Sequence, residues 1–214
     1  MKYSDKNGEG LIVHAYNRGN NKERIFFDEQ DYKAFLFRMA LSLGFTPEEL
    51  NNIDILRMLY SRIRIESGKK NQFKIHSFCL MPNHFHLIIE QCGKTSISKF
   101  ISRLCISYAT YINKKYRRVG HLFQDRYKSN PISSDEQLMW TSAYIHMNPV
   151  KDHIVKSPEK YRWSSYNDYV GTREIKIVTN DLITELFGDK DAFIKETLNY
   201  FSKDDYMSRT RLDM

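Results

Sequence analysis

The stretch FKIHSFCLMPNHFHLIIEQ, residues 73–91, decides the fold. Two runs rich in β-branched, aromatic and aliphatic residues flank a Pro-Asn pair, which predicts two strands joined as a hairpin. Side chains alternate between the two faces of a strand, so Phe85 and Leu87 face the core. His84 and His86 then project together from the opposite face, with Cβ atoms about 7 Å apart.

Strands and helices alternate in the rest of the chain, without long parallel runs. This pattern favours an α+β fold, in which helices pack on a sheet. A strand is predicted at 10–17 and an extended segment at 121–132. Helices are predicted at 31–44 (opening on Asp31), 46–66, 95–116, 135–148 (capped by Ser134, ended by Pro149), 179–188 and 190–201, followed by a loose tail.

Composition predicts a folded protein with a polyanionic partner. The chain has 214 residues, 41% of them hydrophobic, and a formal net charge of +7. That length allows a substantial core, and an excess of positive charge suits nucleic acid. The cysteines at 79, 92 and 105 show no Cys-x-x-Cys spacing, and the sequence shows no secretory leader and no membrane-spanning stretch. We therefore expect reduced thiols, a cytoplasmic location and no membrane partner.

The paired histidines suggest a metal site. Two neutral imidazoles on one face of a strand can hold a divalent ion between them. For an isolated His-x-His pattern the commoner alternative is a pair of polar residues on an open sheet face, so other segments decide the question.

The helix predicted at 135–148 supplies the second group of interest. Tyr144 and Asn148 are four residues apart and share one helical face, close to the end predicted at Pro149. A phenol and a carboxamide placed in this way can act as a nucleophile and an oxygen ligand. The alternative is that Tyr144 is an amphipathic core residue, one of 14 tyrosines in the chain.

Positive charge is concentrated between residues 114 and 128. Six basic residues there are interleaved with aromatic ones and accompanied by a single acidic residue, a pattern that suits single-stranded nucleic acid. A solvated helix end accounts for residues 114–118 equally well, but not for the basic residues of the following extended segment. The predicted DNA-binding residues are Lys114, Lys115, Arg117, Arg118, Arg126 and Lys128.

Four blocks in this order resemble the single-tyrosine HUH transposases, and in particular the REP-associated tyrosine transposases. They are CLMPNHFHLII, GHLFQDRYKS, YIHMNPVK and WSSYNDYVG, and segments near both ends of the chain also fit. The resemblance implies a ferredoxin-like antiparallel sheet with helices packed on it and a C-terminal helical extension. It also implies a catalytic domain at 1–150, elaborated at 46–66, and an extension at 151–214 that packs on it.

The resemblance carries roles onto particular residues. The two metal-binding histidines of the family fall on His84 and His86, and its catalytic tyrosine falls on Tyr144. Asn148 takes the place of an amide-bearing ligand that is commonly glutamine in insertion-sequence relatives. The rival nucleophiles are Tyr108, Tyr111 and Tyr116, which do not match the catalytic block.

The activity implied is metal-dependent cleavage and rejoining of single-stranded DNA beside hairpins, with no small-molecule substrate. Tyr144 would attack a phosphorus atom and form a 5′-phosphotyrosine link, with Mg²⁺ or Mn²⁺ as the cofactor. Two alternatives stay open: a nuclease that uses water, and a hairpin-binding protein without activity. The extension after residue 150 favours a monomer, although mobile-element relatives act as homodimers.

Overall fold

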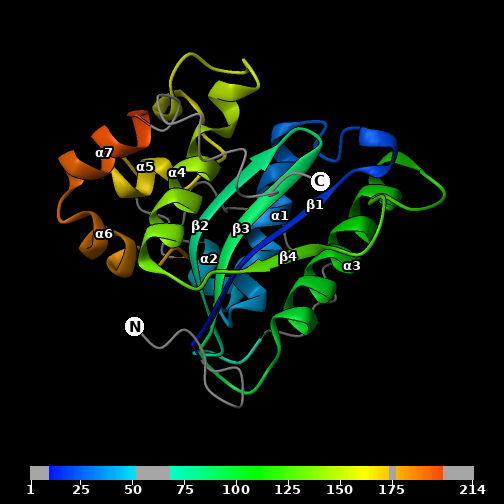
Figure 1. Cartoon of the computed structure of the whole chain (residues 1–214). Coiled ribbons are helices and arrows are strands. Elements are labelled where there is room, and N and C mark those ends of the chain that lie inside the picture. Colours follow the sequence, from blue (N-terminus) through cyan, green and yellow to red (C-terminus); the bar gives the residue numbers. More distant parts are fainter. Residues whose placement is uncertain (1–9, 52–67, 174–176, 200–214) are drawn as a thin grey trace.

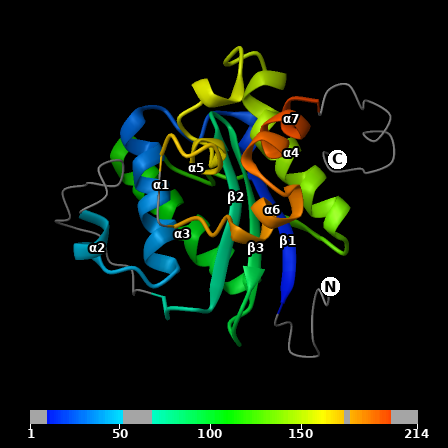
Figure 2. The same cartoon turned by 90° about the vertical axis from the view of Figure 1, so that its left-hand side faces the viewer.

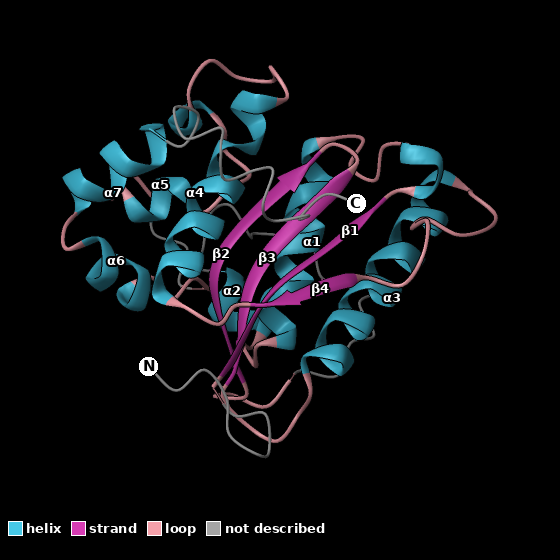
Figure 3. Ribbon diagram, in the orientation of Figure 1, coloured by secondary structure: helices cyan, strands magenta, loops and turns pink. Residues whose placement is uncertain are grey.

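The computed structural model describes residues 10–51, 68–173 and 177–199. Their four strands form one antiparallel sheet in the order β2-β3-β1-β4 (Figure 3). The strands are β1 (Leu11–Arg18), β2 (Phe73–Met81), β3 (His84–Gln91) and β4 (Lys128–Pro131). The hairpin predicted at 73–91 is confirmed as β2 and β3. With the helices α1 and α3 in the two crossovers, the chain path and strand order are those of a ferredoxin-like sheet, as the resemblance implied.

Helices cover both faces of the sheet (Figures 1 and 2). Helices α1 and α3 lie on one face, and α4 lies on the other together with the C-terminal helices α6 and α7. The helices are α1 (Glu29–Ser42), α2 (Pro47–Asn51), α3 (Ile97–Tyr116), α4 (Asp135–Lys151), α5 (Tyr166–Tyr169), α6 (Asp181–Phe187) and α7 (Lys190–Leu198), with 3₁₀ turns η1 (Asn20–Lys22) and η3 (Pro158–Lys160).

The alternation of β3 divides the core into two parts. Phe85, Leu87 and Ile89 are buried in the cluster beneath α1 and α3. Ile88, on the same face of β3 as the histidines, belongs to a second cluster with α4 and the C-terminal helices. Residues after 150 supply 7 of the 17 buried residues of this second cluster; the predicted domain boundary itself stays a prediction.

Two predicted helix boundaries were wrong. Helix α1 begins at Glu29, because Asp28 rather than Asp31 is its N-cap. The carboxylate of Asp28 accepts the backbone N–H of Asp31, and the carboxylate of Asp31 accepts the backbone N–H of Asp28. Helix α4 runs through Pro149 to Lys151, and the N–H of Asp152 still bonds to the carbonyl of Asn148 at 3.0 Å. Proline removes one N–H from the last turns only, and Pro149 is buried, so packing outweighs the local preference.

Residues 52–66, which are most of the helix and proposed elaboration predicted at 46–66, lie outside the described residues. So do residues 200–214, which include the end of the last predicted helix and the predicted tail. The described part, α2, starts at Pro47 as expected. Of the helices that the structure describes, none has the length and hydropathy that a membrane crossing requires.

Helix α4 is anchored to β2 through a buried histidine. His146 Nε2 lies 2.7 Å from Ser165 Oγ, which in turn accepts the N–H of Phe78 in β2 at 2.9 Å. The rings of Tyr166, Tyr169 and Phe193 surround the imidazole. This burial, with a smaller contribution from the charge of Arg173, lowers the pKa of His146 to about 3.

Acid should therefore destabilise the fold through His146. Above about pH 6.5 the imidazole is neutral in both the folded and the unfolded chain. Between about 6.5 and the folded pKa of about 3, only the unfolded chain takes up the proton, so stability falls by about 1.4 kcal/mol per pH unit. We expect the urea-unfolding free energy of His146→Gln to depend less steeply on pH over this range. Equal slopes for the variant and the parent protein would contradict this assignment.

Candidate active site

The two predicted histidines lie side by side at the start of β3, directly after the Pro82–Asn83 turn. Their ring centroids are 5.0 Å apart and their planes are nearly perpendicular. Both side chains are buried, at 5% and 2% exposure for His84 and His86, so they are not the open polar pair of the alternative interpretation. Both project from the sheet face that α4 packs on, opposite to Phe85.

A third histidine, which the sequence analysis missed, contacts this pair. His14 lies on β1, and its Nε2 shares a hydrogen bond of 2.9 Å with Nδ1 of His86. In the antiparallel register, Tyr16 is opposite His86 and His14 is opposite Ile88, so His14 and His86 are diagonal neighbours on one face. The alternation of Ile12, His14 and Tyr16 was visible in the sequence, but this register was not.

Nδ1 of His84 also has a hydrogen-bond partner. It lies 2.6 Å from Oδ1 of Asn83, and Nδ2 of Asn83 donates to the backbone carbonyl of Lys22 at 3.1 Å. The loop that carries Lys22 is therefore tied to the turn that begins the histidine strand.

Burial keeps His86 neutral. Loss of hydration holds the pKa of this imidazole well below its ordinary value, and the charges of neighbouring groups, including His84 and His14, add to the effect. A neutral imidazole has a lone pair for a metal ion. Nε2 of His86 is buried and has no hydrogen-bond partner, whereas Nδ1 is occupied by His14. The free position is therefore Nε2.

Tyr144 of α4 lies against the histidines. Its ring centroid is 5.6 Å from that of His86, in an edge-to-face contact, and 6.2 Å from that of His14. Trp140, one turn earlier, stacks on the ring of Tyr144, with the ring centroids 5.7 Å apart. The Lys151 ammonium lies 5.3 Å from the ring centroid of Tyr144. The structure thus brings the predicted nucleophile into ring contact with one of the two predicted ligands, His86.

Asn148, the predicted oxygen ligand, lies one turn beyond Tyr144 and is buried. Its amide nitrogen donates to the carbonyl of Tyr144 at 3.0 Å. The ligand role of its amide oxygen stays a prediction. No group of three or more histidine, cysteine or acidic side chains able to hold a metal occurs in the described part of the chain. The candidate ligands are thus two imidazoles and one amide.

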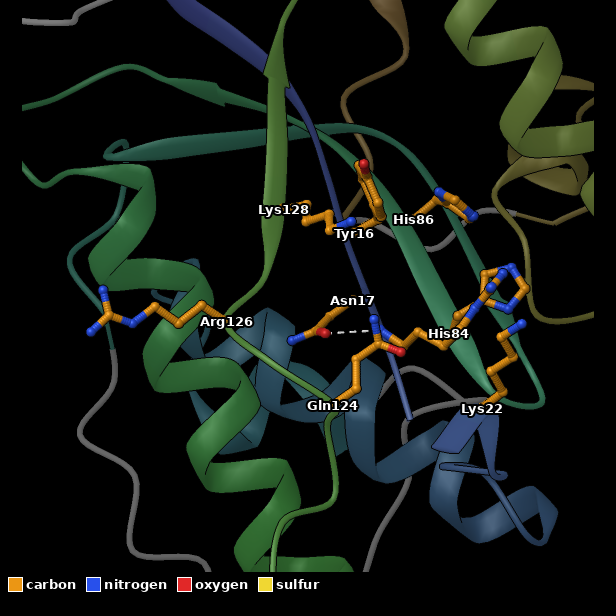
Figure 4. A pocket seen from close by; sticks show the side chains of 9 residues that line it. Tyr16, Asn17, Lys22, His84, His86, Gln124, Arg126 and Lys128 are labelled. Atoms are coloured by element: carbon orange, nitrogen blue, oxygen red, sulfur yellow. Dashed lines mark hydrogen bonds between the residues drawn. The ribbon is translucent and has the colours of Figure 1, made fainter. Parts of the chain in front are cut away.

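A cavity of about 130 Å³ opens beside the histidines (Figure 4). Four of its lining residues are basic and, among the described residues, none is acidic. In Figure 4, Lys22 extends toward His84 and Lys128 toward Tyr16, whereas Arg126 extends the opposite way, toward α3. The lining consists of Tyr16, Asn17, Arg18, Lys22, His84, His86, Gln124, Arg126 and Lys128.

A wider groove of about 870 Å³ continues from this cavity. It lies between α3 and residues 120–127, and it shares Asn17, Gln124 and Arg126 with the cavity. The half-buried rings of Phe123 and Tyr127 line it. Arg126 therefore lines both the histidine cavity and the groove.

The basic residues at 114–118 do not line the histidine cavity. The Lys115 ammonium is bound within the protein, at 2.7 Å from Asp28 and 2.8 Å from Asp31. Arg118 lies 3.7 Å from Glu23, whereas Lys114 and Arg117 are exposed. Contacts of these four residues with DNA stay a prediction, and half of the set already has carboxylate partners.

The rival tyrosines lie on α3, which covers the other face of the sheet. The hydroxyl of Tyr108 donates to the carbonyl of Ile25, and those of Tyr111 and Tyr116 donate to Asp31. Burial and the neighbouring carboxylates raise the pKa of Tyr116 to about 12. Of these tyrosines and Tyr144, only Tyr144 contacts the histidines in the described residues.

The structure defines an α+β protein with a ferredoxin-like antiparallel sheet, on which the helix that carries Tyr144 packs beside the histidine pair. Residues 52–148, a little under half of the chain, are similar to the sequence profile of the family "Transposase IS200 like". The fold is similar to that of a solved REP-associated tyrosine transposase bound to a REP hairpin, with a TM-score of 0.54. The similarity covers 85% of this chain and 91% of that one at 15% identity. No curated protein sequence matches this chain.

Proposed function

We propose that this protein cleaves and rejoins single-stranded DNA beside hairpins, in a metal-dependent transesterification with Tyr144 as the nucleophile. The observation that carries the proposal is the contact between the rings of Tyr144 and His86, because His86 also lines the cavity that holds four basic residues. The family match supports a transposase reaction, and the hairpin bound by the structural relative supports the type of DNA.

The proposed step exchanges one phosphodiester for another. The phenol oxygen of Tyr144 forms a bond to phosphorus, the bond from phosphorus to the 3′ oxygen breaks, and the phenol proton ends on the released 3′-hydroxyl. The 5′-phosphotyrosine link conserves the energy of the phosphodiester, so rejoining needs no ATP. A free tyrosine is almost entirely protonated at neutral pH, so the negative charge that develops on the attacking oxygen must be stabilised as the bond to phosphorus forms.

The residues present fit a divalent ion. His84 and His86 would hold it, with the Asn148 oxygen as the proposed third ligand, and the buried unpartnered Nε2 of His86 supports this assignment. When bound, the ion would polarise the scissile phosphate. A mixed nitrogen and oxygen set suits Mn²⁺ better than Mg²⁺, although cellular supply favours Mg²⁺.

We infer that one chain is sufficient for the reaction. Tyr144 and His86 come from the same polypeptide and their rings are in contact, so no exchange of the tyrosine helix between two copies is needed. This geometry supports the monomer expected from the sequence as the active form.

The test is an oligonucleotide that carries a hairpin and single-stranded flanks, incubated with the protein and Mn²⁺. We expect a covalent protein–DNA adduct on a denaturing gel, and none after chelation. Cleavage without an adduct would indicate a nuclease that uses water. Binding without cleavage would indicate a recognition protein. Either result would overturn the proposal.

The cavity should bind phosphate groups through Lys128. This exposed side chain reaches the cavity from β4, so its removal should weaken binding of single-stranded DNA and lower the slope of log K against log salt by about 1. Fluorescence anisotropy over a salt series with Lys128→Ala measures both quantities. Lys160→Ala, an exposed lysine outside the cavity, is the matched control. An unchanged slope for Lys128→Ala would remove this residue from the DNA interface.

A further inference from the structure

The hydrogen bonds around the histidine pair engage Nδ1 of both rings, through Asn83 for His84 and through His14 for His86. We propose that Asn83 and His14 are positioning residues that hold His84 and His86 with the proton on Nδ1, so that both rings offer Nε2 to the metal ion. This inference rests on the proposed function only in taking the two histidines as ligands. It assigns a role to two residues, one of them 70 positions before the metal-binding motif.

The orientation of the Asn83 amide follows from its backbone partner. The carbonyl of Lys22 can only accept a hydrogen bond, so the group of Asn83 that faces it at 3.1 Å is the NH₂. The other end of the amide, Oδ1, can only accept. At 2.6 Å from this oxygen, Nδ1 of His84 must therefore be the protonated nitrogen. The lone pair of the neutral ring is then on Nε2.

The loop that supplies the Lys22 carbonyl is fixed to the histidine turn. The N–H of Gly19 donates to the carbonyl of Asn83 at 2.8 Å, and the N–H of Ile25 donates to that of Pro82 at 2.9 Å. Between them, Asn21 and Lys22 adopt left-handed backbone angles, which aim this carbonyl. Asn83 is therefore held from both sides, and its side chain cannot turn over without losing a hydrogen bond.

His14 does for the second ring what Asn83 does for the first. One proton lies between Nε2 of His14 and Nδ1 of His86, which are 2.9 Å apart. If His14 carried this proton, Nε2 of His86 would be a buried N–H and could not bind a cation. If His86 carries it, the buried N–H is on Nδ1 of His14 instead, and Nε2 of His86 keeps its lone pair for the ion. Binding of the ion, rather than the hydrogen bond alone, therefore favours the second arrangement. Stacking on Tyr16 at 5.1 Å holds the His14 ring in place.

Outer partners of this kind fix the orientation of a metal-binding histidine and raise its basicity, and their loss typically costs 10–100-fold in metal affinity. Here the two supports come from different elements, a turn and a neighbouring strand. Each can therefore be removed without the other.

The first experiment reads the tautomers directly. A long-range ¹H–¹⁵N correlation spectrum of the metal-free wild-type protein, assigned with His84 and His86 substitutions, should show Nδ1 protonated and Nε2 bare in both rings. A protonated Nε2 on either ring would overturn the inference. This measurement needs no folded variant of Asn83 or His14.

The second experiment measures Mn²⁺ affinity by electron paramagnetic resonance. We expect Asn83→Ala and His14→Phe to bind Mn²⁺ about 10–100-fold more weakly. His14→Gln, whose amide oxygen can accept from Nδ1 of His86, should recover most of the affinity. His153→Phe, on an exposed residue, is the control. Wild-type affinity in folded Asn83→Ala and His14→Phe, or no Mn²⁺ binding by the wild type, would overturn the inference.

Neither readout depends on DNA cleavage. A protein that binds Mn²⁺ with the stated tautomers but forms no DNA adduct would refute the proposed function and leave this inference intact. A DNA adduct formed by a protein whose histidine tautomers differ from those stated would refute this inference and leave the proposed function intact.

Discussion

Tyr144→Phe should abolish the covalent DNA adduct altogether. The substitution removes the one oxygen that can form the phosphotyrosine bond, and it keeps the ring that contacts Trp140 and His86. We expect strand cleavage to disappear with the adduct, while DNA affinity and Mn²⁺ affinity stay near those of the parent protein. Loss of one hydroxyl should change stability by about 1 kcal/mol at most, which thermal unfolding can verify.

Tyr111→Phe is the matched control for this substitution. Its hydroxyl is on α3 and bonds to Asp31, on the opposite side of the sheet from the histidines, so adduct formation should persist. An adduct retained by Tyr144→Phe and lost by Tyr111→Phe would move the nucleophile to another helix. Peptide mapping of the adduct would then identify the residue.

His86→Ala should have the second largest effect. It removes the ligand whose Nε2 is buried without a hydrogen-bond partner, and it leaves His14 without its partner on β3. We expect Mn²⁺ affinity to fall by more than the roughly 100-fold that marks the upper range for outer partners, and adduct formation to fall with it. Titration calorimetry with Mn²⁺ and the adduct gel measure the two quantities.

His76→Ala is a suitable comparison, because it removes another buried histidine from the neighbouring strand β2. His76 bonds to Glu90 at 2.8 Å and to the carbonyl of Thr179, so its loss tests stability without touching the candidate site. Metal affinity should be kept in this variant. Should His86→Ala bind Mn²⁺ as tightly as His76→Ala does, His86 would not be a ligand.

Local periodicity predicted the central hairpin well. The alternation of Phe85, His86 and Leu87 is a property of neighbouring residues, so the strand and the faces of its side chains follow without knowledge of the rest. The helix predicted at 95–116 was found for the same reason, as α3 with Ser96 as its N-cap. The local rule failed at Pro149. The residue before a proline disfavours the helical conformation, but packing of α4 on the sheet outweighs this preference, so the helix continues through Pro149.

Contacts between distant segments were not predictable in this way. Lys115 was expected to bind DNA, yet its ammonium is neutralised by carboxylates on α1, and nothing in the sequence near Lys115 indicates that α1 lies beside it. His14 lies 72 residues before its partner His86. Lys22, whose carbonyl orients Asn83, is in a loop with no recognisable motif.

The sequence by itself determined the histidine hairpin, the tyrosine helix and the order of the strands along the chain, because each depends on the spacing of nearby side chains. Only the tertiary structure decided that Tyr144 contacts His86, that His14 and Asn83 support the pair, and which basic residues reach the cavity. These contacts depend on the register between strands and on the packing of α4 against the sheet, and both are set by burial of the whole core rather than by any local pattern.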